Sequence, residues 1–262
     1  ASSIAMHGDA SEVFEIIAED ADGDETTFNL NINVNVPEIT TPTVPVDSDE
    51  VISHKDITNT VNTGSGDDTV TATKDIKNQA EINTNAGDDT VTAKNLLGGS
   101  INTAEGNDTV TITHDMKNQT SINTGDDDDT VTITNNFDKG TINTGSGDDT
   151  VTIGHDMKNQ ATINTGSGDD TVTIGHNMDT SSINTGDGDD TVTIGNEMKN
   201  QASINTGEGN DTVTIGNKMK DSSSIDTGDG DDTVTIEDKL EGQASIEMGA
   251  GFDILDLERD AD

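Results

Sequence analysis

The chain has no cysteine, tryptophan or tyrosine, and only four phenylalanines and three prolines among its 262 residues. Basic residues are scarce too, since 12 lysines and arginines stand against 53 acidic residues, a formal net charge of −41. The absence of cysteine excludes a cysteine nucleophile and fits an exported bacterial protein. The acidity makes nucleic acids and anionic membranes poor partners, because both are negatively charged.

Apolar residues are also few, at 28% of the chain, and no apolar run approaches the roughly 20 residues that span a bilayer. Low hydrophobicity with high net charge is typical of disorder. A regular period in the sequence indicates order instead, so we expect a counter-ion to complete the fold. Ala1–Ile4 has neither the basic start nor the apolar core of a signal peptide. We expect the chain to be a fragment of a longer polypeptide.

Residues 1–36 differ from the rest and predict a small β-hairpin. Residues 13–17 and 28–34 are strand-like, and the turn "DADGD" (20–24) lies between them. This turn resembles that of cadherin- or Ig-like repeats in very large bacterial adhesins, so the hairpin either ends such a domain or caps the C-terminal part of the chain. Residues 37–56, acidic and rich in Thr with three prolines, predict a stiff linker.

Residues 57–262 form a repeat array in which "TGSGDDTVTI" (165–174) and its close copies recur every 19 to 21 residues. "MKNQATI" (157–163) alternates with "MDTSSI" (178–183), which suggests duplication of a two-repeat unit of about 41 residues. The second aspartates of the ten copies are Asp68, Asp89, Asp108, Asp129, Asp149, Asp170, Asp190, Asp211, Asp232 and Asp253.

Each repeat predicts two short strands and two turns. In "TVTI" Val172 and Ile174 point inward while the threonines point outward, and Ile163 points inward from "ATIN". No single repeat can bury its few apolar residues, but stacked coils build one thin core. We therefore predict an all-β fold, a parallel β-solenoid of about ten coils. An apolar position in the return turn is expected to fill the core; it holds Ile76, Met116, Phe137, Met157, Met178, Met198, Met219 and Leu240.

The composition of the acidic turn predicts a cation site. With Thr165–Asp170 numbered as positions one to six, position six is Asp in every copy, whereas Asn107, Asn210 and Phe252 replace Asp at position five. Glycine at positions two and four permits positive φ and exposes carbonyl oxygens. One obligatory carboxylate beside several carbonyls suits Ca²⁺, which takes about six to eight oxygen ligands. We expect each position-six carboxylate to serve the gaps on both of its sides.

These turns resemble the calcium-binding nonapeptide G-G-x-G-x-D-x-U-x of RTX proteins. "TGSGDDTVT" (165–173) matches it except at Thr165. The resemblance implies a right-handed β-roll with about nine Ca²⁺ between successive turns, held by the ten aspartates and by backbone carbonyls. The return turns lack the motif, so calcium is expected on one edge only, a pattern similar to the ice-binding region of an RTX adhesin. The carbonyls lie around Gly64, Gly66, Gly87, Gly106, Gly125, Gly145, Gly147, Gly166, Gly168, Gly186, Gly188, Gly207, Gly209, Gly228, Gly230, Gly249 and Gly251.

Outward Thr-x-Thr pairs recur in nine successive coils and allow two interpretations. Threonine suits any exposed strand, but flat Thr-x-Thr arrays are also typical of β-solenoid antifreeze proteins. The threonines are Thr69, Thr71, Thr90, Thr92, Thr109, Thr111, Thr130, Thr132, Thr150, Thr152, Thr171, Thr173, Thr191, Thr193, Thr212, Thr214, Thr233 and Thr235.

No catalytic site is expected. No G-x-S-x-G motif or isolated Ser, His and Asp cluster occurs. His114, His155 and His176 share one return-turn position and are predicted to face solvent, with adventitious transition-metal binding as the alternative. The resemblance implies a calcium-dependent rod or spacer module of a bacterial cell-surface adhesin, exported by type I secretion and joined to neighbouring domains. The alternative function is an ice-binding module.

Overall fold

The computed structural model describes residues 13–19, 25–31 and 49–257, which fall into two units. The first unit contains β1 (Val13–Glu19) and β2 (Glu25–Asn31), which pair antiparallel with Val13 opposite Asn31. The expected hairpin is therefore present, although its second strand starts at Glu25 rather than at residue 28. The "DADGD" turn lies outside the described residues. Whether the hairpin ends an Ig-like domain or caps the solenoid stays a prediction.

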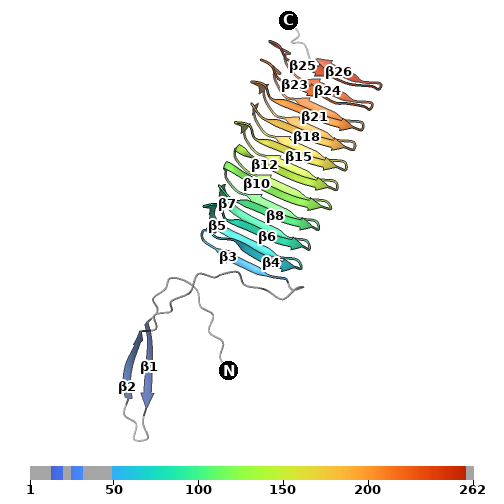
Figure 1. Ribbon diagram of the computed structural model, residues 1–262. Helices are drawn as coiled ribbons and strands as arrows, with labels where there is room; N and C mark the ends of the chain where they lie inside the picture. Colours follow the sequence, from blue (N-terminus) through green and yellow to red (C-terminus); the bar gives the residue numbers. More distant parts are fainter. Residues whose placement is uncertain (1–12, 20–24, 32–48, 258–262) are drawn as a thin grey trace. The chain divides into compact units, whose positions relative to one another are not determined.

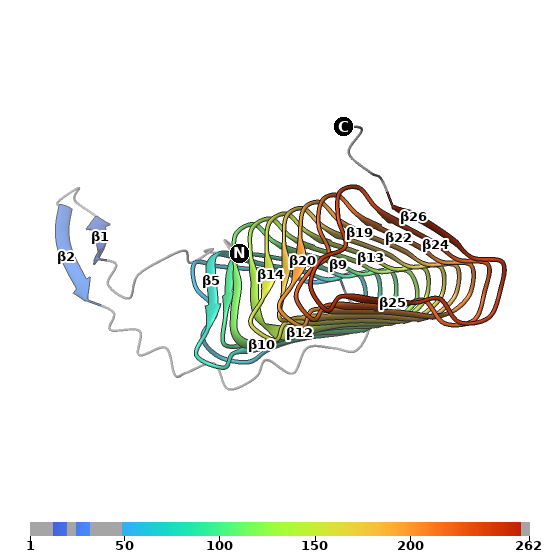
Figure 2. The same cartoon turned by 90° about the horizontal axis from the view of Figure 1, so that it is seen from above.

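The second unit confirms the predicted all-β fold, a parallel β-solenoid of about ten coils (Figure 1). Its strands form a threonine face, an asparagine face and a short return face. Figure 2, a view along the stack, shows the two long sides and the short strands at one end. The threonine face comprises β3 (Val51–His54), the first parts of β5 (Thr69–Lys77) and β7 (Thr90–Leu97), β9 (Thr109–Ile112), β11 (Thr130–Ile133), β13 (Thr150–Ile153), β16 (Thr171–Ile174), β19 (Thr191–Ile194), β22 (Thr212–Ile215), β24 (Thr233–Ile236) and β26 (Ile254–Leu257).

The other two faces complete each coil. The asparagine face comprises β4 (Val61–Ser65), β6 (Glu81–Ala86), β8 (Ser100–Glu105), the last parts of β10 (Met116–Asp126) and β12 (Phe137–Ser146), β15 (Thr162–Ser167), β18 (Ser182–Asp187), β21 (Ser203–Glu208), β23 (Ser224–Asp226) and β25 (Ser245–Glu247). The return face holds the ends of β5 and β7, the starts of β10 and β12, β14 (Met157–Lys158), β17 (Met178–Asp179) and β20 (Met198–Lys199).

Alternation along each strand produces the core, as predicted. Every "TVTI" strand pairs in register with the next, so that Val151, Val172 and Val192 stack on one another. Val172 and Ile174 are fully buried, as is Ile163 from the opposite face. The return-turn residues from Ile76 to Met219 are buried too, whereas Leu240 is 41% exposed near the end of the stack. One continuous apolar column thus runs through the coils.

The solenoid begins before the predicted boundary at residue 57. β3 lies in the segment expected to be a linker, yet it pairs in parallel with β5, with Val51 opposite Thr69 and Ser53 opposite Thr71. Ile52 packs against the core and Ile57 is buried. The stretch lacks the glycines of the repeat motif, but Lys55-Asp56-Ile57 repeats Lys74-Asp75-Ile76 of the next coil and was the available sign of an added coil.

Candidate metal centre

The acidic turns bring successive backbones into close contact, which explains their glycines. Gly168 has a φ of +124°, and a Cβ there would lie 2.1 Å from the carbonyl oxygen of Gly147 in the preceding coil. Non-glycine residues at equivalent places also adopt positive φ, as at Asn85 (74°), Ala104 (88°) and Asp127 (79°). The turn therefore needs left-handed backbone at positions two and four, and the glycines meet that need without strain.

The position-six carboxylates form a buried ladder along one edge. Asp68, Asp89, Asp108, Asp129, Asp149, Asp170, Asp190, Asp211 and Asp232 are at most 1% exposed. Oδ1 of each accepts a hydrogen bond from the backbone N–H of the equivalent residue in the preceding coil; Asp149 N–H donates to Asp170, for example, at 2.8 Å. Oδ2 of all nine has no hydrogen-bond partner. An unpartnered buried carboxylate oxygen is costly unless a ligand completes the site.

The direction of the ladder corrects one expectation. Each carboxylate was expected to serve the gaps on both sides, but the Asp170 side chain reaches only toward Asp149. The gap that follows Asp170 holds the side chain of Asp190 instead, which accepts from Asp170 N–H at 2.8 Å. Every gap thus contains one position-six carboxylate, supplied by its C-terminal coil.

Burial makes these carboxyl groups weak acids in the metal-free molecule. It raises the pKa of Asp129 and Asp170 to about 7 and that of Asp108 and Asp190 to about 6. The position-one hydroxyl, which lies nearby but donates to a backbone carbonyl rather than to Oδ2, and the donated N–H oppose this effect, while stacked aspartates add to it. The pKa values of Asp89, Asp149 and Asp211 are raised for the same chief reason, burial. A neighbouring cation would favour the ionised forms.

Position five forms a second ladder that the sequence did not predict. Asp148 Oδ1 accepts from Asp169 N–H at 2.8 Å, and Asp169 Oδ1 accepts from Asp189 N–H at 2.8 Å. This exposed ladder points toward the C-terminus, opposite to the buried one. Asparagine provides the same oxygen, as when Asn107 Oδ1 accepts from Asp128 N–H. The Asp-to-Asn exchanges at position five, visible in the sequence, were the available sign.

On the return edge, asparagine side chains separate the stacked carboxylates and donate hydrogen bonds to them. In the row of residues that precede the buried return-turn side chains, Asp and Asn alternate from Asp75 to Asn177. Asn136 Nδ2 donates to Asp115 Oδ1 at 3.2 Å, and Asn177 Nδ2 donates to Asp156 Oδ1 at 3.0 Å. Although partial burial raises it, hydrogen bonds from Lys117 and Asn136 bring the pKa of Asp115 below its usual value. The two-repeat alternation seen in the sequence thus interleaves charged with neutral side chains.

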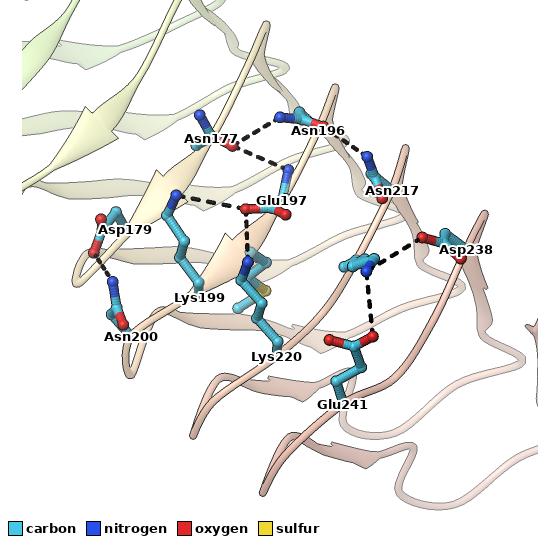
Figure 3. A network of polar contacts seen from close by, with 12 residues as sticks. Asn177, Asp179, Asn196, Glu197, Lys199, Asn200, Asn217, Lys220, Asp238 and Glu241 are labelled. Carbon is cyan, nitrogen blue, oxygen red and sulfur yellow. Dashed lines mark hydrogen bonds and ion pairs between the residues drawn. The ribbon is translucent and has the colours of Figure 1, made fainter.

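Lysines form ion pairs with several other acids of the return edge, among them Asp56, Glu197 and Asp238. Every lysine of the chain lies in a return segment. Figure 3 shows Lys199 and Lys220 beside Glu197, with Nζ–Oε2 distances of 3.5 and 2.9 Å. The acidic turns have no lysine, and none has asparagine at position six. Within residues 49–257, only that edge therefore stacks buried carboxylates without lysine or asparagine side chains between them.

The candidate metal ligands of each gap, a carboxylate and backbone carbonyls, are all oxygen atoms, which suits a hard cation such as Ca²⁺. In the part of the chain that the structure describes, no three His, Asp or Glu side chains converge as a site built from side chains alone would need. An ion in a gap would take one position-six carboxylate, with backbone carbonyls of the two turns as its other protein ligands. The ligand role of the carbonyls at positions two and four stays a prediction.

The threonine and asparagine faces differ in how their polar groups are used. On the asparagine face Asn143 Nδ2 donates to Asn123 Oδ1 at 2.7 Å, and Asn164 Nδ2 donates to Asn143 at 2.7 Å. On the threonine face the eighteen predicted residues stack in register, as Thr171 does between Thr150 and Thr191. Their hydroxyls, all within the described residues, make no side-chain hydrogen bond to the protein. The last coil ends both columns with Ile254 and Asp256.

The three histidines are exposed, as predicted. His155 and His176 lie one coil apart with ring centroids separated by 4.8 Å, while His114 lies two coils before His155. They form no cluster with a nucleophile. Among the described residues, no helix has the length and apolar character needed to cross a membrane.

No protein-family model matches the sequence, and no curated protein sequence does so either. A solved structure does match: a hyperactive, Ca²⁺-dependent, beta-helical antifreeze protein from an Antarctic bacterium. The TM-score is 0.66 over 85% of this chain and 83% of that chain, at 20% sequence identity. The fold is β-helical. At this identity the similarity concerns the fold alone, and the RTX resemblance rests on the turn motif.

Proposed function

We propose that this protein is a calcium-binding β-solenoid that folds when Ca²⁺ fills the gaps between its acidic turns. The observation that carries the proposal is the row of nine buried Oδ2 atoms without partners. The contrast with the return edge supports it, since there Asn and Lys side chains balance the acids. The similar structure is described as Ca²⁺-dependent, which agrees with this proposal.

Electrostatics explain why calcium and folding would be coupled. Nine Ca²⁺ would reduce the formal charge from −41 to about −23. Without them, nine buried carboxylates lie along one edge, one coil (about 4.8 Å) apart. Each would have to be ionised without a cation or be protonated, and both are unfavourable near neutral pH. The free energy of metal binding would thus be folding free energy.

In biological terms, we propose an extracellular rod or spacer. Modules that depend on millimolar Ca²⁺ suit the outside of the cell. A stack of similar coils forms an extended spacer from one short repeated sequence. The adhesin context, cell-surface location and type I secretion are inferred from the RTX resemblance and from the adhesin-like turn at residues 20–24.

Circular dichroism during calcium removal tests the proposal. Chelation should abolish the β-sheet signal, and millimolar Ca²⁺ should restore it. Mg²⁺ is the control, because its smaller, strictly octahedral shell fits carbonyl-rich turns poorly. A metal-free protein with the same spectrum and melting temperature as the calcium form would contradict the proposal.

Ice binding is the second candidate function, and the threonine face favours it. Its eighteen hydroxyls are stacked in register and free of side-chain bonds to the protein, so they are available to order water. The asparagine face, whose amides bond to one another, lacks this property. The description of the similar structure as an antifreeze protein also supports this candidate.

A single charge on the threonine face distinguishes ice binder from plain rod. Thr191→Lys should leave the calcium-bound fold stable to within about 1 kcal/mol, because the site is an exposed strand position. If the face binds ice, thermal hysteresis and ice faceting at micromolar protein should be lost in this variant. Ser182→Lys, on the asparagine face, is the matched control and should retain them. A wild-type protein without ice shaping in calcium buffer would reject this candidate and leave the rod.

A further inference from the structure

An additional coil without the repeat motif precedes the coil of the first acidic turn. Thr69 N–H donates to the carbonyl oxygen of Glu50 at 2.7 Å, as Thr90 N–H does to that of Asp68 at 2.8 Å in the next coil. Asp67 N–H donates to Asp49 Oδ1 at 3.2 Å, the bond that position-five side chains form elsewhere. Asp49 and Glu50 therefore make the hydrogen bonds of positions five and six in this additional coil.

The carboxylate of Asp68 lies in the gap between Glu50 and the first acidic turn. Its Oδ1 accepts from Glu50 N–H at 2.7 Å, the same bond that Asp89 Oδ1 makes with Asp68 N–H at 2.8 Å. Its Oδ2 is buried and has no partner, and the residue is 1% exposed. The gap that follows Asp68 already contains Asp89. The series of nine unpartnered oxygens thus starts one gap earlier than a stack of ten aspartate turns would require.

We propose that the gap between Glu50 and Asp68 is a calcium site, formed by the Asp68 carboxylate and backbone oxygen of residue 50. This additional site rests on the proposed function and adds one ion to those between the ten aspartate turns. The gap uses the backbone of residue 50 rather than its side chain, so glutamate is compatible with this position. Calcium here fastens β3 to the stack and makes the attachment of the first coil calcium-dependent.

Paired Asp→Asn variants of the full chain test this site. Asparagine keeps the Oδ1 acceptor for the inter-coil hydrogen bond and removes the negative charge. Asp68→Asn removes the proposed ligand, Asp190→Asn removes its interior counterpart, and Asp67→Asn changes an exposed position-five side chain. Bound Ca²⁺ per chain is measured by equilibrium dialysis, and amide hydrogen exchange is measured at Thr69 and Thr191. These two amides donate across the two gaps, to Glu50 and Asp170.

Asp68→Asn and Asp190→Asn should each lose one Ca²⁺ per chain, and Asp67→Asn none. In Asp68→Asn the Thr69 amide should exchange about tenfold faster or more, equal to about 1.4 kcal/mol of local stability, with Thr191 unchanged. Asp190→Asn should show the reverse. If Asp68→Asn keeps the full calcium complement while Asp190→Asn loses one ion, the N-terminal site is refuted and the proposed function stands. A wild-type chain that binds no Ca²⁺ refutes both.

Discussion

At the scale of single residues, the two aspartates of each turn have different tasks. Asp170 is buried, reaches toward the preceding coil and has one oxygen without a partner. Asp169 is exposed and accepts from Asp189 in the following coil. The charge of the first matters because water cannot solvate it, whereas the second needs only an acceptor oxygen, which asparagine also has.

Asp170→Asn should therefore change stability in opposite directions with and without calcium. The pKa of Asp170, about 7 against an ordinary 3.8, implies a penalty on the order of 2–4 kcal/mol for ionising it in the metal-free fold at pH 8. Asparagine removes that penalty, so residual structure in chelator should be more stable than in wild type. In saturating Ca²⁺ the variant should instead melt at a lower temperature, because one ion is lost.

Asp169→Asn is the control for this comparison and should be nearly neutral in both conditions. Thermal melts followed by circular dichroism, in chelator and in millimolar Ca²⁺, provide the melting temperatures of the two variants, each compared with wild type. A destabilised Asp170→Asn in both conditions would mean that the carboxylate supports the fold without a metal.

At the scale of the element, the turn is defined by close backbone approach as much as by charge. Gly168 and Gly64 have almost the same φ, +124° and +128°. A Cβ on Gly168 would strike the Gly147 carbonyl, whereas one on Gly64 would meet no atom of the described residues within 4 Å. These two glycines therefore separate steric overlap from backbone strain.

Gly64→Ala should cost only the strain of a left-handed alanine, about 1–2 kcal/mol. Gly168→Ala should cost that amount plus about 1–3 kcal/mol for the overlap, and should weaken calcium binding in the adjacent gap. Chemical denaturation in saturating Ca²⁺ measures both free energies. Equal losses would show that overlap with the neighbouring carbonyl is relieved by small shifts and that φ alone selects glycine.

At the scale of the whole molecule, protons would compete with the proposed calcium ions for the same edge. Seven position-six carboxyls have raised pKa values in the metal-free fold, so this fold binds protons more tightly than the unfolded chain. These groups therefore stabilise the fold as pH falls from above their folded pKa values, about 6–7 for Asp108, Asp129, Asp170 and Asp190, toward the ordinary value of 3.8.

We expect acid to replace calcium in part. In chelator, the β-sheet signal should be weak at about pH 8 and should increase by about pH 5, as buried carboxyls become protonated. In Ca²⁺ the dependence should be opposite, since protons displace the metal and melting temperature falls with pH. Thermal melts at both pH values, with and without Ca²⁺, measure whether stability changes with pH in these two opposite directions. A metal-free chain that loses structure on acidification would contradict the burial of these groups.

Much of the fold could be read from the sequence, because a solenoid repeats one local pattern. The alternation in "TVTI" and the ten acidic turns predicted strands, core and coil number, and these are confirmed. The N-terminal coil was missed, since Asp49 and Glu50 are not preceded by the glycines of the acidic turns; they join the stack through Asp49 Oδ1 and the backbone of Glu50. The direction of each carboxylate was missed as well, because sequence spacing is the same for either neighbour. It depends on side-chain torsions that only the packed turn determines.

The parallel register also governs how the solenoid would respond to mechanical tension. Hydrogen bonds between coils run along the stack, and β3 and β26 lie at its opposite ends (Figure 1). A pull on these ends would load the outermost gap first and peel coils off in turn. Each released coil would yield about 20 residues, roughly 70 Å of extended chain, in place of a rise of about 4.8 Å. Such a rod would lengthen in steps and dissipate work, with calcium concentration setting the force at each step.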